Sequence, residues 1–144
     1  MRYLGLDLGT RTCGIAISDL THTIASPYKV LHFSDSDYES ILPILNDIIR
    51  DEKIGKIILG LPKNMNNTMG DRCDTTIEFK DMLEKYVNVE VILQDERLST
   101  VAAHNYMLEA DLSRKKRKAK VDGLAANIIL QTYLDIERGK ENGN

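Results

Sequence analysis

Apolar and polar positions follow two different periods along this chain of 144 residues, and the period indicates where strands and helices lie. Two apolar segments, Tyr3–Leu8 and Cys13–Ser18, flank the short turn Gly9–Thr12, which is typical of an antiparallel hairpin. A third strand is expected over Tyr28–Phe33, directly after Pro27. The chain therefore opens with strands rather than with a helix.

The rest of the chain alternates between helical spacing and short apolar runs. Apolar residues at helical spacing predict a helix over Ser36–Glu52, with Pro43 expected to kink it or delay its start. The run Lys56–Leu61 predicts a buried parallel strand that Pro62 stops. The later elements are expected to be a loop over residues 62–72, a helix ending at Tyr86, a strand over Val89–Leu93, a helix from Ser99 or Thr100 to about Glu109, and a last helix from about Val121 to Arg138.

This order of elements predicts an α/β fold. We expect a five-stranded mixed sheet, antiparallel in its first hairpin, with helices on both faces. The length of the chain and its hydrophobic content of 42% fit one domain with a real core. The expected domain covers residues 1–138, and a disordered tail rich in Gly and Asn is expected over residues 139–144.

Charge is distributed unevenly along the chain. Residues 114–120 hold six of the 19 lysines and arginines and no acid, whereas the whole chain has 22 acidic residues. An acidic body with one concentrated basic segment favours a local contact with a polyanion. The alternative is a solvated connector between two helices, which an isolated charge run often is.

The two cysteines and the absence of long apolar runs bear on location. Cys13 and Cys73 match neither a CxxC pair nor a zinc-ligand spacing, which favours reduced thiols in an intracellular protein. No stretch approaches the roughly 20 apolar residues of a membrane span, and none has the pattern of a signal peptide. A cytoplasmic protein with no membrane partner is expected.

Carboxylates stand at three positions where the predicted fold makes them unusual. Asp7 interrupts the apolar first strand, Asp95 and Glu96 come straight after the expected last strand, and Asp122 heads the last helix. Ligand sites in open α/β sheets gather at the carboxyl ends of strands. The first two positions agree with that rule.

Helical spacing predicts that Asp122 faces the sheet. It shares one stripe of the last helix with a set of small and apolar residues: Ala125, Ala126, Ile129, Tyr133 and Ile136. An inward carboxylate beside other carboxylates suffers repulsion and desolvation unless a cation compensates. Clusters of carboxylate oxygens select hard cations such as Mg²⁺ or Mn²⁺, and two such metals together can drive phosphodiester hydrolysis.

Each acid taken alone also has a simpler interpretation. Asp7 could be a turn former that hydrogen-bonds toward Gly9 or Thr10. Asp95 or Glu96 could be a loop acid, and Asp122 could be an N-terminal helix charge favoured by the macrodipole. The metal-site hypothesis depends on the acids coming together.

Four segments of the chain resemble one family. They are "GLDLGTRTCGIAISD", "GLPKNMNNTMGDR", "DERLST" and "LSRKKRKAKVDGLAANIILQTYLD", and the resemblance to the YqgF family, also called RuvX, runs from about residue 3 to 138. It implies a ribonuclease H-like fold related to RuvC-type resolvases and a phosphodiesterase site that uses Mg²⁺ or Mn²⁺. By motif position the catalytic and metal-binding acids would be Asp7, Glu96 and Asp122, with Asp95 as a competitor of Glu96.

The resemblance also implies a nucleic-acid substrate. The leading expectation is maturation of the 5′ end of 16S ribosomal RNA on pre-rRNA or a ribosomal precursor particle, by a monomer or a homodimer. The alternatives are resolution of branched DNA at Holliday junctions and a non-catalytic RNA-binding role in ribosome assembly. Contacts to the nucleic acid are expected from the basic segment, the first turn and the 62–72 loop, namely Arg114, Lys115, Lys116, Arg117, Lys118, Lys120, Thr10, Arg11 and Asn64.

Two features stand apart from this assignment. The chain departs from the commoner family pattern at Asn66, Asn67 and Asp71, which puts a catalytic role for that loop in doubt. The motif D-x-G-T after a first strand also occurs in sugar kinases, actins and Hsp70-type ATPases. Those proteins clamp a nucleotide between two such domains, and 144 residues supply only one.

Overall fold

The computed structural model describes residues 1–62, 71–95 and 114–143, and of these it describes residues 71–73, 114–123 and 140–143 by their backbone alone. Five strands form one sheet in the order β3-β2-β1-β4-β5. The strands are β1 (Arg2–Leu8), β2 (Thr12–Ser18), β3 (Ala25–His32), β4 (Ile54–Leu61) and β5 (Glu90–Asp95). The first three strands are antiparallel and β1, β4 and β5 are parallel, so the expected mixed sheet with an antiparallel first hairpin is confirmed.

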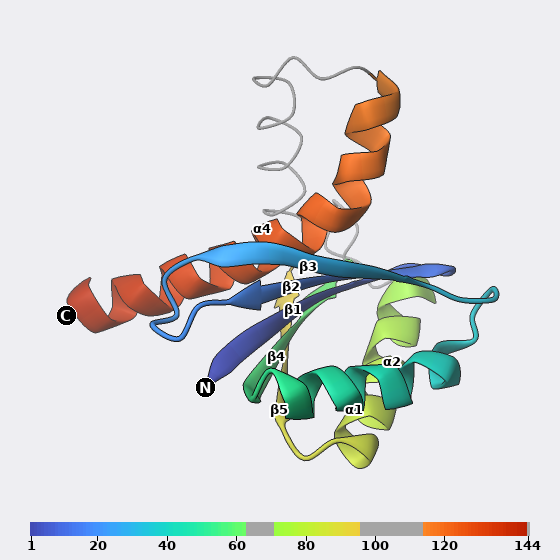
Figure 1. Ribbon diagram of the computed structural model, residues 1–144, viewed down its shortest axis with the longest axis horizontal. Helices are drawn as coiled ribbons and strands as arrows, with labels where there is room; N and C mark the ends of the chain where they lie inside the picture. Colours follow the sequence, from blue (N-terminus) through green and yellow to red (C-terminus); the bar gives the residue numbers. More distant parts are fainter. Residues whose placement is uncertain (63–70, 96–113, 144) are drawn as a thin grey trace.

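Helices cover both faces of the sheet. A short 3-10 helix η1 (Tyr38–Ile41) leads into α1 (Leu42–Asp51), and α2 (Asp71–Tyr86) packs beside α1 on the same face. The long helix α4 (Arg114–Gly143) covers the opposite face (Figure 1). Two apolar clusters result, one between the sheet and the α1/α2 layer and one between the sheet and α4.

Pro43 and Pro27 affect the backbone as proline chemistry predicts, but the strand that contains Pro27 begins earlier than expected. Pro43 lies in the first turn of α1, where a missing N–H costs nothing, so it delays the helix rather than kinking it. The third strand begins at Ala25 instead of after Pro27, so the expected boundary was wrong. Pro27 is tolerated inside this strand because β3 is an edge strand and the β2–β3 register shifts between Ile15 and Ala16, beside the proline.

The last helix is longer than expected at both ends. It begins at Arg114, so the basic segment is helix and not a connector, and it continues to Gly143 through residues expected to form a disordered tail. Lysine and arginine are good helix formers, and no proline interrupts the run. Figure 1 shows the first turns of α4 (orange) standing away from the sheet and its later part (red) lying across it.

Most of the predicted stripe of α4 does face the sheet. Ala126, Ile129 and Tyr133 are buried there, but Ile136 is 43% exposed, so its assignment to the stripe was wrong. Leu130 and Leu134 pack on the sheet instead. None of the described helices is long and apolar enough to cross a membrane.

Candidate active site

Asp7 occupies the face of β1 that α4 covers. Leu4 and Leu6 pack in the cluster beneath α1 and α2, whereas Gly5 lies under α4, where an added Cβ would meet the Leu130 Cβ at 2.7 Å. Side chains alternate along a strand, so Asp7 shares the face of Gly5. The carboxylate therefore belongs to the α4 side of the sheet, near the carboxyl end of β1.

Glycines flank Asp7 on both neighbouring strands. Asp7 pairs with Gly14 on β2, and Gly60 follows Leu59, the β4 partner of Leu6. The row Gly14, Asp7, Gly60 carries a single side chain, and that side chain is only half-buried. This row leaves room beside the carboxylate for a ligand or for other acidic groups.

The contacts of α4 with β1 show which helical turns lie nearest Asp7. The ring of Tyr3 lies 6.2 Å from that of Tyr133, and Gly5 lies against Ala126 and Leu130. Moving along β1 toward Asp7 thus moves backward along α4. The earlier turns of α4 contain position 122, four residues or about one turn before Ala126.

Asp95 and Asp7 belong to opposite faces of the sheet, because side chains alternate between the faces along each strand. Asp95 is the last residue of β5, not the first residue after the strand as expected. Val91 and Leu93 pack with the α1/α2 layer, and Ile92 packs with α4. Asp95 is two residues after Leu93, so it belongs to the face of the sheet that α1 and α2 cover. Its neighbour Glu96 lies outside the described residues, as does Asn64.

The turn between β1 and β2 presents Thr10 and Arg11 to solvent beside the carboxyl end of β1. The Gly9 amide donates a hydrogen bond to the Thr12 carbonyl at 2.7 Å, which closes the turn. The Arg11 guanidinium lies 4.0 Å from a carboxylate oxygen of Asp35, and both side chains are largely exposed. A pair of this kind contributes little to stability, so Arg11 is available to an anionic ligand.

Cys13 is the titratable group that Asp7 affects directly. Burial raises the pKa of the Cys13 thiol well above its usual range, and the charge of Asp7 raises it further. The thiol belongs to the apolar cluster beneath α1 and α2 and forms no disulfide. Cys13 is therefore a structural residue and not a nucleophile.

This assignment predicts slow alkylation of Cys13. In a Cys73→Ser background at pH 8, we expect iodoacetamide to modify the native protein at least about a hundredfold more slowly than the unfolded chain, because the thiol is both inaccessible and protonated. Mass spectrometry of timed samples measures the rate. Rapid native labelling, absent from a Cys13→Ala/Cys73→Ser control, would contradict the assignment.

Comparison with known proteins identifies the family. The family model described as "RuvX: Holliday junction resolvase" matches residues 1–136. The chain belongs to the RuvX family. A Staphylococcus aureus protein named "Putative pre-16S rRNA nuclease" is 46% identical to this RuvX-family chain over 135 residues, covering 93% of this chain and 95% of the relative.

Solved structures support the same fold for this RuvX-family chain. Thermus thermophilus RuvC in complex with a Holliday junction substrate aligns with a TM-score of 0.58 at 12% identity, covering 96% of each chain. The fowlpox virus Holliday junction resolvase aligns with a TM-score of 0.53 at 17% identity, covering 94% of this chain and 99% of that one. The α/β fold expected from the sequence is thus confirmed as that of RuvC-type resolvases.

The described residues by themselves do not assemble a complete metal site. Among them, no group of three His, Cys, Asp or Glu side chains could hold a metal ion. The predicted set includes Glu96, which lies outside the described residues, and Asp122, whose side chain is not described. Asp7 does fit a hard cation, because it offers carboxylate oxygens from a half-buried position beside two glycines.

Sequence reasoning missed two features of this region. One is the pair of glycines beside Asp7, which only the strand pairing reveals. The other is Asn127 of α4, whose side-chain oxygen is buried and has no hydrogen-bond partner in the described structure. An amide in the otherwise apolar run "LAANIIL" was the available signal, since a buried polar group needs a partner or a function.

Proposed function

We propose that this RuvX-family protein is a metal-dependent nuclease whose substrate is a nucleic acid. The observation that carries the proposal is the position of Asp7: a carboxylate at the carboxyl end of the central strand, between two glycines, on the face that α4 covers. Family membership over residues 1–136 supports hydrolysis of phosphodiester bonds. The nuclease domain would cover residues 1–138.

The proposed ligand set is Asp7, Glu96 and Asp122, which would hold Mg²⁺ or Mn²⁺. Asp95 belongs to the opposite face of the sheet from Asp7, and this favours Glu96 as the acid supplied by the end of β5. Divalent metal ions would activate a water molecule for attack and stabilise the leaving oxygen. The protein's own part is to hold three carboxylates together, and the close seating of α4 on Gly5 supports that arrangement.

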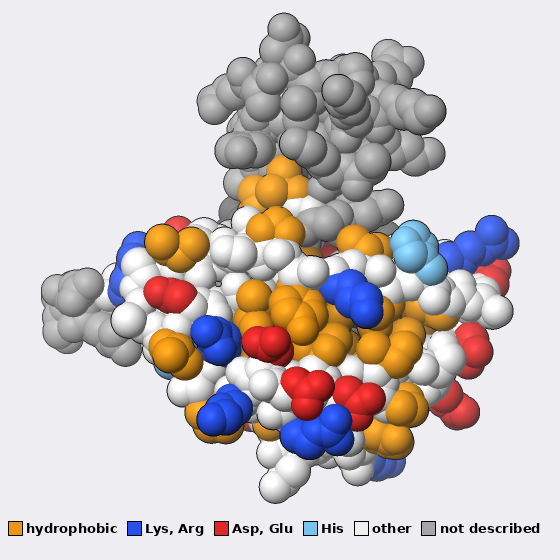
Figure 2. Space-filling model, in the orientation of Figure 1, with side chains coloured by type: hydrophobic (Ala, Val, Ile, Leu, Met, Phe, Trp, Pro, Cys, Tyr) orange, Lys and Arg blue, Asp and Glu red, His pale blue; other side chains and the backbone are white. Residues whose placement is uncertain are grey.

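Binding of the nucleic-acid backbone is assigned to the basic segment at the start of α4. In the described part of the face shown in Figure 2, cationic and acidic side chains are intermingled rather than segregated. Residues 114–120 instead carry six cations without an acid, on the part of α4 that stands away from the sheet. Thr10 and Arg11 in the first turn, and Asn64, would add contacts nearer the site.

Removing cations from this segment should weaken binding and flatten its salt dependence. For Lys115→Gln/Lys116→Gln/Arg117→Gln, we expect the slope of log K against log salt concentration to fall by about 0.7 to 0.9 for each phosphate that the protein no longer neutralises. Fluorescence anisotropy at several salt concentrations measures the slope. The control Lys29→Gln/Lys53→Gln/Lys85→Gln removes the same charge elsewhere, and equal slopes in both variants would contradict the assignment.

The leading substrate is precursor 16S ribosomal RNA, cleaved in the cytoplasm at its 5′ end. The 46% identical relative carries that name, whereas the RuvC and poxvirus resemblances extend to the fold alone. Cleavage of precursor rRNA and of a four-way DNA junction, compared in the same buffer with Asp7→Asn as control, tests the choice. Symmetric junction cleavage would require two active sites and hence a homodimer, whereas RNA processing needs only a monomer.

A non-catalytic role in ribosome assembly is the second candidate. It predicts that Asp7→Asn retains biological function while neutralising the basic segment abolishes RNA binding. Complementation by Asp7→Asn in cells that lack the gene separates the two roles.

A further inference from the structure

Directional polar contacts hold α4 to the sheet on both of its flanks. On one flank, Gln131 Oε1 accepts a hydrogen bond from the Ala25 amide at 2.8 Å, and Gln131 Nε2 donates one to the Thr23 carbonyl at 3.0 Å. On the other flank, Lys56 Nζ of β4 donates a hydrogen bond to the Tyr133 hydroxyl oxygen at 3.2 Å. The sheet order puts β3 and β4 on opposite sides of β1, so α4 is tethered from both sides as it crosses the sheet (Figure 1).

Helical geometry explains what the two tethers do. Successive residues of a helix turn by about 100°, so positions 131 and 133 lie about 200° apart, on nearly opposite flanks. Between these flanks, Leu130 and Leu134 pack in the apolar cluster on the sheet. Apolar burial has no direction, whereas a hydrogen bond holds only over a narrow range of distance and angle. The clamp formed by Gln131, Tyr133 and Lys56 therefore fixes the rotation of α4, because rolling the helix either way breaks a tether.

Neighbouring groups orient both tethers. Gln131 Nε2 also donates a hydrogen bond to Asp135 Oδ1 at 3.0 Å, and the Arg138 guanidinium donates one to the same oxygen at 3.1 Å. On the other flank, Lys56 Nζ lies over the face of the Tyr3 ring, 5.0 Å from its centroid. Groups that are already oriented lose little freedom when they form a hydrogen bond. The clamp is thus a built contact between three strands and one helix.

The rotation of α4 decides where a carboxylate at position 122 lies. This position precedes Gln131 by nine residues, or about two and a half turns, so it belongs to the flank opposite Gln131. A side-chain group roughly 5 Å from the helix axis moves by about 1 Å for every 10° of rotation. Functional groups of a site must be held within about 0.5 Å of their productive positions. A small roll of α4 would therefore be enough to disturb the proposed ligand set.

We propose that Gln131 and Tyr133 are positioning residues of the active site, which set the rotation of α4 that brings Asp122 to Asp7. The inference rests on the proposed nuclease function, because only that function makes Asp122 a metal ligand. The close packing of α4 on Gly5 fixes the distance of the helix from β1. The clamp adds the rotation, which that packing leaves free.

Mn²⁺ binding without nucleic acid tests the inference independently of cleavage. Gln131→Met removes both hydrogen bonds to the start of β3 at nearly constant side-chain size, and Tyr133→Phe removes only the hydroxyl group. With free Mn²⁺ measured by electron paramagnetic resonance, we expect the dissociation constant to rise about tenfold in Gln131→Met and about threefold or more in Tyr133→Phe. Cleavage at low Mg²⁺ should fall in parallel and recover in part at saturating Mg²⁺, whereas RNA binding in EDTA should stay at the wild-type level.

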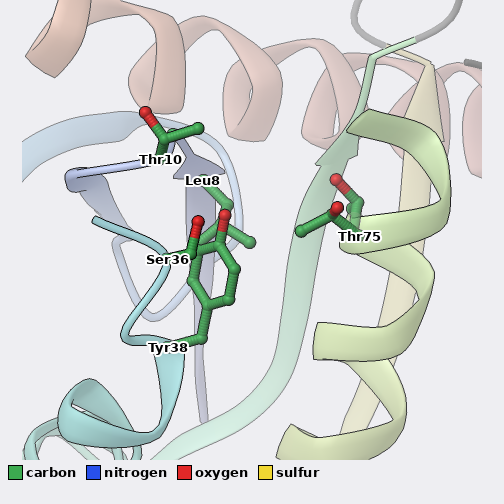
Figure 3. Close-up of a pocket in the computed structure, with 7 residues that line it drawn as sticks. Leu8, Thr10, Ser36, Tyr38 and Thr75 are labelled. Atoms are coloured by element: carbon green, nitrogen blue, oxygen red, sulfur yellow. The ribbon is translucent and has the colours of Figure 1, made fainter. Parts of the chain in front are cut away.

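Val87→Ala is the matched control for loss of stability. It shortens a buried side chain in the cluster beneath α1 and α2. On that face of the sheet a cavity of about 190 Å³ lies between the end of β1 and α2, with Leu8 and Thr75 on facing sides (Figure 3). The substitution touches neither α4 nor Asp7, so at temperatures where it is folded this variant should bind Mn²⁺ as the wild type does.

Two results would overturn the inference. One is wild-type Mn²⁺ binding in both clamp variants, and the other is an equal weakening in Val87→Ala, which would reduce the effect to general stability. Circular dichroism establishes which variants are folded. Tyr133→Phe, which keeps the ring and its packing, decides the outcome if Gln131→Met is unfolded.

Asp7→Asn in the same assays keeps the inference separate from the proposed nuclease function. Loss of Mn²⁺ binding and cleavage in Asp7→Asn, together with wild-type behaviour of both clamp variants, would defeat the positioning role and leave the nuclease proposal standing. Unchanged Mn²⁺ binding and cleavage in Asp7→Asn would defeat the nuclease proposal itself, whatever the clamp variants show.

Discussion

Asp7→Asn should reduce metal-dependent cleavage at least about a hundredfold, because the amide would remove the charge of a proposed metal ligand worth several kcal/mol of transition-state stabilisation. The substitution keeps the size of the side chain, and Asp7 is only half-buried between two glycines, so the fold should be retained. Initial cleavage rates with Mg²⁺ and with Mn²⁺, alongside thermal unfolding, measure both effects. Asp47→Asn, an exposed acid of α1, is the matched control.

The three acids of the proposed ligand set should also act as one unit in cleavage. Asp122→Asn alone should lose about as much activity as Asp7→Asn, and the double variant should lose little more, since groups that serve one site are not additive. Glu96→Gln should match them, whereas Asp95→Asn should retain most activity because its parity places it on the other face of the sheet. Equal cleavage by wild type and Asp7→Asn would remove the basis of the nuclease proposal.

The fold was predictable because its signals are local. The hairpin follows from two apolar runs around Gly9–Thr12, and the parallel strand Ile54–Leu61 follows from a continuous apolar run that Pro62 stops. For the first helix the sequence left open whether Pro43 kinks the helix or delays its start, and the structure shows the delay, with α1 beginning at Leu42. In each case a short stretch of sequence determines the local backbone.

The errors arose where tertiary context decides. Helix propensity extends α4 back to Arg114, although the last helix was expected to begin only at about Val121, and Ile136 lies beyond the part of the helix that the sheet buries. The side of the sheet on which Asp95 falls depends on the register of β4 and β5, which sequence does not reveal. Likewise the glycines beside Asp7 come together only through strand pairing.

Gly5→Ala should destabilise the protein and impair the site through α4. A Cβ at position 5 would lie 2.7 Å from the Leu130 Cβ and 3.0 Å from the Ala126 carbonyl oxygen, so the helix must move away from β1. Overpacking of this kind costs about 1 to 3 kcal/mol of unfolding free energy. Because α4 carries Asp122 and β1 carries Asp7, cleavage should fall even at temperatures where the variant is fully folded.

Gly139→Ala provides the matched control for that prediction. Position 139 lies on the same helix, and an added Cβ there meets nothing within 4 Å, so this variant should gain up to about 1 kcal/mol from helix propensity and keep its activity. Leu130→Ala should not rescue Gly5→Ala, because alanine retains the Cβ that causes the clash. Denaturant unfolding and cleavage rates test the prediction when they are measured on the wild type, Gly5→Ala, Gly139→Ala and the double variant Gly5→Ala/Leu130→Ala. Wild-type stability in Gly5→Ala would show that α4 is not seated on β1 as closely as the 2.7 Å approach requires. The proposal that α4 brings Asp122 to Asp7 would then lose its support.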